Sequence, residues 1–172
     1  QTPIFVMMDL DIGMNHRLCK PLEWDDATVY DRGKVMTAAE LEAGKDFGRY
    51  LDVDGDGIPY RTYPGTHPTK GSFFTRGTSR DRYAKYTEEG APYVDNMQRL
   101  LRKFETAKDI VPKPLIATSA KPTKYGVIYY GSTPPAMDEA IHMIEAQGHA
   151  LDRMRVRAFP FHSSVNSLVA DH

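Results

Sequence analysis

Glycine and proline are frequent between residues 15 and 90, above all between 44 and 77, and this feature limits the possible folds more than any other. Glycine adds backbone freedom and proline removes an amide donor, so long helices and central strands are disfavoured here. One short helix is still predicted, with Thr37 as its N-cap, Glu40 in the capping-box position and Gly44 at its end. So long a segment with little regular structure is unusual in a compact domain. We therefore expect residues 16–111 to form a connector that wraps over other domains or subunits.

The connector ends in a long helix, predicted at residues 92–111. Apolar side chains recur here at helical spacing, Pro92 suits a first helical turn, and Pro112 stops the helix. Lys108 is the only polar interruption of the apolar face. We expect the opposite, charged face to be an ordinary solvated surface. The apolar positions are Tyr93, Met97, Leu100, Leu101, Phe104 and Val111, and the charged ones are Asp95, Arg99, Arg102, Lys103 and Glu105.

The last third of the chain alternates between strand and helix patterns, after a linker rich in proline, threonine and lysine at residues 112–124. The order strand, helix, strand, helix implies a right-handed parallel unit, so the fold class is α/β. Two parallel strands cannot bury such helices alone, and a further strand is expected. The predicted elements are a strand at 125–130, a helix from Pro134 to Gly148, a strand near 154–158 and a helix from Ser163.

The first apolar segment, residues 3–8, is a continuous run rich in strand-forming side chains. Such a run suits a strand buried on both faces, usually in a parallel sheet. Parallel neighbours are delivered by crossover connections, and none precedes this run. We therefore expect residues 1–15 to be the end of another domain, and the chain to be a piece of a larger protein.

Composition excludes several classes of partner. The 22 basic residues are scattered among 23 acidic ones, so no basic stripe is available for nucleic acid. The arginines of residues 153–157 alternate with apolar residues, as in a half-exposed strand. No apolar run reaches the roughly 18 to 20 residues of a membrane span. The single cysteine, Cys19, excludes an internal disulfide framework and favours a reducing compartment, so we expect a cytoplasmic protein.

The most conspicuous motif is the acidic loop Asp52-Val53-Asp54-Gly55-Asp56-Gly57. Alternate carboxylates followed by glycine match the first half of a calcium-binding EF-hand loop, where they converge on one hard cation. The second half does not match, because Tyr63 stands where a bidentate glutamate belongs and Pro59 interrupts the loop. Two interpretations stay open: a cation site at Asp52, Asp54 and Asp56, or a turn whose carboxylates bond their own backbone.

Two further motifs could hold phosphate. Gly55-Asp56-Gly57 opens the motif that holds magnesium on thiamine diphosphate, but no asparagine follows at the required spacing. By itself, then, this chain is not expected to hold the diphosphate. Gly131-Ser132-Thr133 precedes a predicted helix and could offer backbone amides to an anion, or simply cap the helix.

A series of short strings runs through the chain in a fixed order. They are DLDIGMN at 9–15, DRGKV at 31–35, RY at 49–50, DVDGDGIPYRT at 52–62, PGT at 64–66, FTRG at 74–77, YTE at 86–88, RKFETA at 102–107, VPKP at 111–114, YGS at 130–132 and RAFPF at 157–161. The series resembles the alpha subunit of 2-oxoacid:ferredoxin oxidoreductases, of the 2-oxoglutarate type. Each string is weak alone, but the ordered set covers essentially the whole chain.

The resemblance implies a heteromeric enzyme that decarboxylates a 2-oxoacid on thiamine diphosphate, passes electrons through an iron–sulfur cluster to ferredoxin, and forms an acyl-coenzyme A. Residues 1–15 would hold the last strand of a pyrimidine-binding domain, and 16–111 the connector. Residues 125–172 would begin a domain like the C-terminal domain of transketolases. Thiamine diphosphate, magnesium and the cluster would be bound largely outside this chain, by the beta subunit and the rest of the alpha subunit. The resemblance thus implies no catalytic residue here and no activity in isolation.

The sequence departs from the family pattern after residues 74–77. The family usually continues with glycine, histidine and an acidic pair, whereas residues 78–82 are Thr-Ser-Arg-Asp-Arg here. Our hypothesis is that Asp52, Asp54, Asp56, Arg61 and Arg76 face the active-site approach or the partner subunit. Two alternatives are a calcium-binding interaction module centred on Asp52–Asp56 and a purely structural assembly domain.

Overall fold

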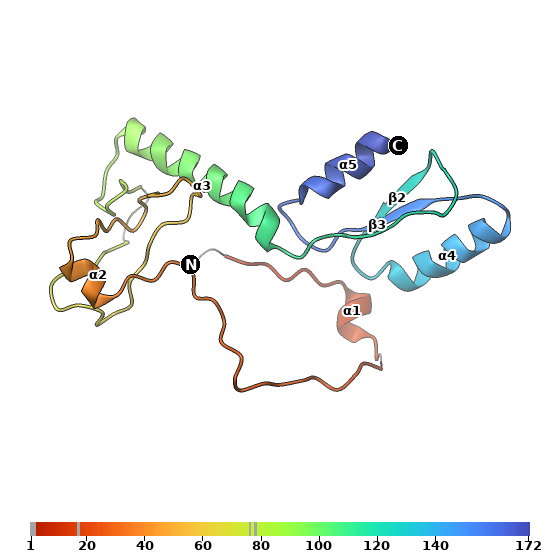
Figure 1. Cartoon of the computed structure of the whole chain (residues 1–172), viewed down its shortest axis with the longest axis horizontal. Coiled ribbons are helices and arrows are strands. Elements are labelled where there is room, and N and C mark those ends of the chain that lie inside the picture. The colour runs from red at the N-terminus through yellow and green to blue at the C-terminus, as the bar shows by residue number, and fades with distance from the viewer. Residues whose placement is uncertain (1–2, 17, 76, 78) are drawn as a thin grey trace. The chain divides into compact units, whose positions relative to one another are not determined.

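The computed structural model describes residues 3–16, 18–75, 77 and 79–172 (Figure 1). Two compact units divide the chain: the α/β unit, residues 1–24 with 108–172, and the connector unit, residues 25–107. None of the helices in the described ranges combines the length and apolar character needed to cross a membrane. The elements are α1 (Leu10–Met14), α2 (Ala38–Glu42), α3 (Gly90–Ile110), β1 (Leu115–Ala117), β2 (Gly126–Tyr129), α4 (Pro134–Ala146), β3 (Asp152–Arg155) and α5 (Ser163–Asp171).

The α/β unit contains the predicted parallel pair. Strand β2 pairs with β3 from Gly126 opposite Asp152 to Tyr129 opposite Arg155, and α4 connects them. Pro134 opens α4, as predicted. Gly148, with φ of +88°, ends that helix: its amide and that of His149 donate to carbonyls of the last turn at 2.9 and 3.3 Å. This is a Schellman ending, which a glycine in the left-handed region allows.

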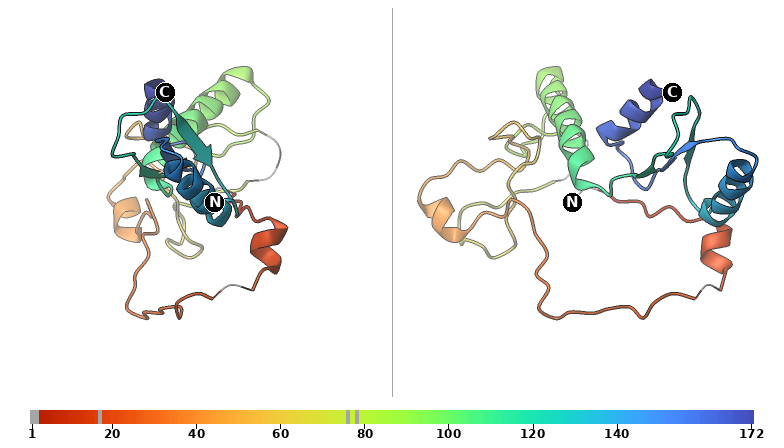
Figure 2. Two further views of the ribbon diagram at one scale, coloured as in Figure 1. Left: turned by 90° about the vertical axis from the view of Figure 1, so that its right-hand side faces the viewer. Right: turned by 45° about the vertical axis from the view of Figure 1, so that its right-hand side comes forward.

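Helices α4 and α5 lie on opposite sides of the strand pair (Figures 1 and 2). Met154 on β3 is fully buried and packs with Val165 and Leu168 of α5. The neighbouring Arg153 points to the other face, where it lies 3.5 Å from Asp138 of α4. Because successive strand residues face opposite sides, each helix covers one face of the sheet.

Strand β1 makes the sheet mixed. It pairs antiparallel with β3, in the order β1-β3-β2, and lies within residues 112–124, where we expected only a linker. The three residues of β1 are too few to show a strand period, and prolines precede them. Its existence depends on the β3 edge, which the local sequence does not reveal.

The strand predicted for residues 3–8 is not formed. The backbone from Pro3 to Asp9 has no strand assignment and pairs with no sheet, and Ile4 and Phe5 are more than four-fifths exposed. A strand needs a partner backbone, and none lies beside this run among the described residues. Helix α1 follows instead, unpredicted, with the carboxylate of Asp9 accepting the amide of Ile12 at 2.8 Å.

The connector unit contains almost no regular structure apart from α2 and most of α3. Helix α2 has the predicted capping box: Thr37 Oγ1 accepts the amide of Glu40, and the Glu40 carboxylate accepts the amide of Thr37. Met36 and Leu41 are buried. Arginines are buried as well, so the interior of this unit contains charged groups beside apolar ones. Among the described residues, the buried polar ones are Arg49, Thr62, Arg80 and Arg99.

Helix α3 turns a different face inward from the one its sequence predicts. Arg99, placed on the solvated face, is only 5% exposed, whereas Leu101 of the apolar face is 58% exposed. Arg99 Nη1 donates to the carbonyl of Gly57 at 2.9 Å, and its Nε and Nη2 donate to Asn96. These acceptors satisfy the buried guanidinium, so the predicted solvated face was wrong at this position.

Candidate functional site

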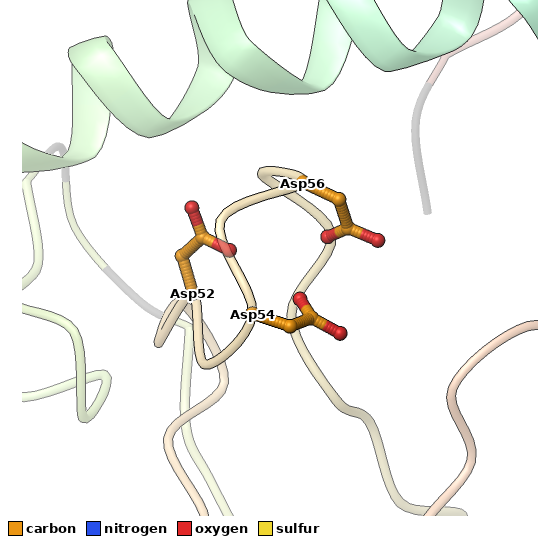
Figure 3. Close-up of side chains that lie close together, drawn as sticks. All are labelled: Asp52, Asp54 and Asp56. Carbon is orange, nitrogen blue, oxygen red and sulfur yellow. The ribbon is translucent and has the colours of Figure 1, made fainter.

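The acidic loop brings its three carboxylates together. One oxygen each from Asp52, Asp54 and Asp56 lie within 4.8 Å of one another, and Figure 3 shows the last two carboxylates beside each other. Asp52 Oδ1 accepts the amides of Gly55 and Gly57 at 3.0 and 3.1 Å. The loop therefore organises itself through its own backbone, as one of the two sequence interpretations proposed.

Lys34 occupies the position where a cation would be expected. Its Nζ lies 2.6 Å from both carboxylate oxygens of Asp54 and 2.7 Å from Oδ2 of Asp56. Partial burial alone would lower the pKa of Lys34, but the hydrogen bonds to the two carboxylates raise it above its usual value. The bond from Lys34 in turn lowers the pKa of Asp54. The ammonium stays charged and offsets part of the negative charge of the loop.

Helix α3 holds the other side of the loop. Arg102 Nε donates to Asp52 Oδ2 at 3.0 Å, and the Asp52 side chain is only 8% exposed. Thr106 Oγ1 donates to the carbonyl of Asp56 at 2.6 Å. Backbone contact is close at Gly57, with φ of +77°: a Cβ there would lie 2.2 Å from the amide nitrogen of Lys103. Only glycine fits at this position.

Arg61 supports the segment that carries Lys34. Its backbone amide donates to the carbonyl of Lys34 at 2.9 Å, and Val35 bridges to Arg61 in parallel. Its Nη2 donates to the carbonyl of Arg32 at 2.6 Å, while the guanidinium stacks on Tyr63. The structure thus joins Arg61 to the acidic loop through Lys34. Arg76, the remaining predicted site residue, lies outside the described residues.

The donor set does not fit the magnesium ion of a diphosphate. Lys34 bonds two of the three carboxylates and Arg102 bonds the third, so the oxygens are already used by resident cations. An iron–sulfur cluster requires several cysteine thiolates, and Cys19 is the single cysteine of the chain. We derive no step through either group from these residues. Lys34 and Arg102 were not among the predicted site residues, since their contacts span long sequence separations.

Cations also gather deeper in the connector unit. The guanidinium groups of Arg49 and Arg99 both stack on Tyr50, at 5.6 and 5.7 Å from the ring centre. Burial lowers the pKa of each, and mutual repulsion lowers that of Arg99 further. Burial, with repulsion from the same two arginines, also lowers the pKa of Lys103. The sequence showed only isolated arginines here.

The predicted anion turn at residues 131–133 accommodates a carboxylate of the chain itself. Ser132 Oγ donates to Asp9 Oδ2 at 2.6 Å, and this bond is the main reason that the pKa of Asp9 is lowered. Thr133 Oγ1 bonds the carbonyl of Tyr130 instead of capping α4. The turn therefore joins α1 to the start of α4.

Comparison with solved structures gives a likeness of fold. No family model and no curated protein match the chain. A chain of the 2-oxoglutarate:ferredoxin oxidoreductase from Magnetococcus marinus, with 2-oxoglutarate, coenzyme A and succinyl-CoA bound, is similar in fold. The TM-score is 0.61 at 17% identity, over 73% of this chain and 22% of that one. The likeness is one of α/β fold, and the chain spans about a fifth of the length of the chain it matches.

Proposed function

We propose that the chain is part of the alpha subunit of a thiamine diphosphate-dependent 2-oxoacid:ferredoxin oxidoreductase. The observation that carries the proposal is the fold likeness over 73% of the chain to a 2-oxoglutarate:ferredoxin oxidoreductase. The ordered strings from Asp9 to Phe161 support the same family independently of the fold. The reaction would be the oxidative decarboxylation of a 2-oxoacid to an acyl-coenzyme A, with electrons delivered to ferredoxin in the cytoplasm.

The chain's own residues would shape and assemble the site. When bound elsewhere in the enzyme, thiamine diphosphate supplies the carbanion chemistry and the cluster carries the electrons. Arg102 and Thr106 of α3 bond the acidic loop on one side, and Lys34, which Arg61 supports, bonds it on the other, so the loop is held at several points. A charged loop held in this way suits the approach to an active site or the contact with a beta subunit. The remainder of the alpha subunit would complete the α/β unit.

The first test is reconstitution. The full alpha chain should be expressed with and without its beta subunit, and reduction of ferredoxin measured with 2-oxoglutarate and coenzyme A present. We expect activity only from the pair, together with iron and thiamine diphosphate in the purified complex. A pair that binds neither cofactor and turns over no 2-oxoacid would overturn the proposal.

A second test separates an active-site role from pure assembly. Asp52, Asp54 and Asp56 should be changed together to alanine in the complete enzyme, and Arg61→Lys made separately. If the loop faces the active-site approach, kcat/KM should fall while the subunits still assemble. Full activity with intact assembly after the triple change would eliminate a role for the loop. Activity lost only in proportion to assembly would favour the structural alternative.

A further inference from the structure

His67 makes hydrogen bonds through both of its ring nitrogens. Nδ1 accepts the backbone amides of Thr69 and Lys70 at 3.1 and 2.9 Å. Nε2 contacts the carboxylate of Glu42, the last residue of α2. The side chain of His67 is only 8% exposed, although the three residues that follow it are exposed. The ring therefore connects residues 67–70 to the end of α2.

These bonds determine which ring nitrogen carries the proton. An imidazole nitrogen accepts a hydrogen bond only when it has no proton of its own, and the neutral ring has one nitrogen of each kind. Because two amides donate to Nδ1, the single ring proton lies on Nε2 and is donated to Glu42. His67 is thus a neutral imidazole in the Nε2–H tautomer as long as the turn keeps this shape.

The charged groups that face the ring are Glu42 of α2 and Lys70 of the turn itself. The bonds from His67 and Lys70 lower the pKa of Glu42, so its negative charge would favour an imidazolium. Lys70 Nζ lies 3.1 Å from the same carboxylate and opposes a further positive charge there. The carboxylate is 62% exposed, and an exposed ion pair contributes little. Depriving two amides of their acceptor has the larger effect, so the amides decide the protonation state.

The backbone on either side of residues 67–70 is held by bonds of its own. On one side, the amide of Thr66 donates to the carbonyl of Tyr63, and the amide of Tyr63 donates to Thr66 Oγ1, both at 3.1 Å. On the other side, Thr62 Oγ1 donates to the carbonyl of Gly71 at 2.6 Å. None of these bonds involves the imidazole. The four residues between the two held points can therefore open while the rest of the connector unit stays folded.

We propose that His67 holds residues 67–70 on α2 in a pH-dependent way, and that a second proton on its ring releases them. A proton added at Nδ1 takes the lone pair that both amides use, so those two bonds break. The ring then leaves its enclosed position, and Glu42 loses its contact with Nε2. Lys70 bonds this carboxylate and the carbonyl of Leu41 from the same turn, so these bonds loosen with it. The release does not depend on the proposed function.

Hydrogen exchange of the full-length protein tests the release. The protection factors of the Thr69 and Lys70 amides are measured by mass spectrometry, with fragmentation that resolves single amides, from about pH 8 to about pH 5. Each rate is corrected for the intrinsic exchange rate at that pH. His67→Asn places a side-chain oxygen near the position of Nδ1 and takes up no proton in this range. His149→Asn is the matched control, since that histidine is exposed in the turn after α4.

The size of the effect follows from the proton taken up by the released ring. A free histidine binds this proton near pH 6.5, so the open turn is favoured roughly thirtyfold more at pH 5 than at pH 8. We expect protection of the Thr69 and Lys70 amides to fall by about that factor in the wild type and in His149→Asn. In His67→Asn it should stay within about twofold. The amides of Tyr63 and Thr66 should keep their protection in all three proteins.

Three outcomes overturn the proposal. Constant protection of the Thr69 and Lys70 amides in the wild type would show that the ring takes up its proton without leaving the turn. An equal fall in His67→Asn would assign the change to another group. A fall that includes Tyr63 and Thr66 would mean that the whole unit unfolds in acid. If circular dichroism shows that His67→Asn does not fold, the wild type decides alone, by whether the loss is confined to residues 67–70.

Discussion

In the α/β unit the buried side chains are apolar, with Met154 packed against Val165 and Leu168. In the connector unit, the buried residues include the arginines Arg49, Arg80 and Arg99 as well as the apolar Met36 and Leu41. An apolar contact depends on volume and tolerates small shifts, whereas a buried guanidinium depends on acceptors at fixed distances. An almost strandless unit can therefore still have a specific structure, because directional bonds take the place of regular secondary structure.

The largest effect is expected from Gly57→Ala. A methyl group there would overlap the α3 backbone at 2.2 Å from Lys103 N and 2.6 Å from Arg99 O, at a φ of +77°. Urea unfolding of the full-length protein should show a loss of about 4 kcal/mol or more. Gly55→Ala is the control: its φ is +82° but no atom lies within 4 Å, so about 1 kcal/mol is expected. Equal losses of stability in the two variants would show that the close contact between Gly57 and the α3 backbone is unimportant.

Met154→Ala tests the apolar side of the comparison. Removing this fully buried side chain from between the sheet and α5 should cost about 3 kcal/mol, through lost burial and a cavity. Ile128→Ala, at a paired position that is 45% exposed, should cost much less. Thermal unfolding of both variants at low and high salt measures this, and the loss at Met154 should not change with salt. A strong salt dependence there would erase the distinction between the two units.

Lys34→Met should reduce stability less than the two changes above, but it should alter the response of the protein to calcium. It leaves Asp54 and Asp56 unneutralised, and since the pair is partly exposed the loss should be about 1 kcal/mol. Calcium should then stabilise the variant but not the wild type, because three carboxylates compete poorly for calcium while an ammonium bonds two of them. Thermal unfolding with and without calcium measures the difference. A calcium response of the wild type would restore the cation-site interpretation.

The smallest effect concerns acid sensitivity at the α2 cap. The hydrogen bonds from Lys45 and Thr37 lower the pKa of Glu40 to about 2 from its usual 4.5. Because the folded-state pKa is depressed, this stabilisation is present above pH 4.5 and is lost as the pH falls toward 2. Glu40→Gln should therefore reduce the pH dependence of the unfolding midpoint between these pH values. Glu139→Gln on α4 should leave that dependence unchanged. If the unfolding midpoint of Glu40→Gln depended on pH as steeply as that of the wild type, the capping box would contribute nothing measurable to stability.

Pattern reading worked where structure is set locally. The capping box at Thr37, the start of α4 at Pro134 and its end at Gly148 depend on neighbouring residues alone, and each was predicted correctly. The parallel pairing of β2 and β3 also follows from element order. The convergence of the aspartates followed from their alternate spacing in the loop.

Pattern reading failed where a distant partner decides. The run at residues 3–8 has the composition of a strand but pairs with no sheet, and β1 exists only because β3 lies beside it. Arg99 follows the polar periodicity of α3, yet the carbonyl of Gly57 draws it inward. Lys34, the cation of the acidic loop, could not be assigned to it without the fold. Most of the ion pairs among the described residues join positions far apart in the sequence, and periodicity carries no information on them.

Lys34 has a practical consequence for handling and for motif searches. A motif search that scores only residues 52–57 would classify this loop as a calcium-binding loop. Calcium would then be added to the buffers during purification. With an ammonium covalently part of the chain, the loop should keep its shape in a chelating buffer. Searches for such loops would gain selectivity if they also asked whether a lysine lies on the segment paired beside the loop, as Lys34 does next to Arg61.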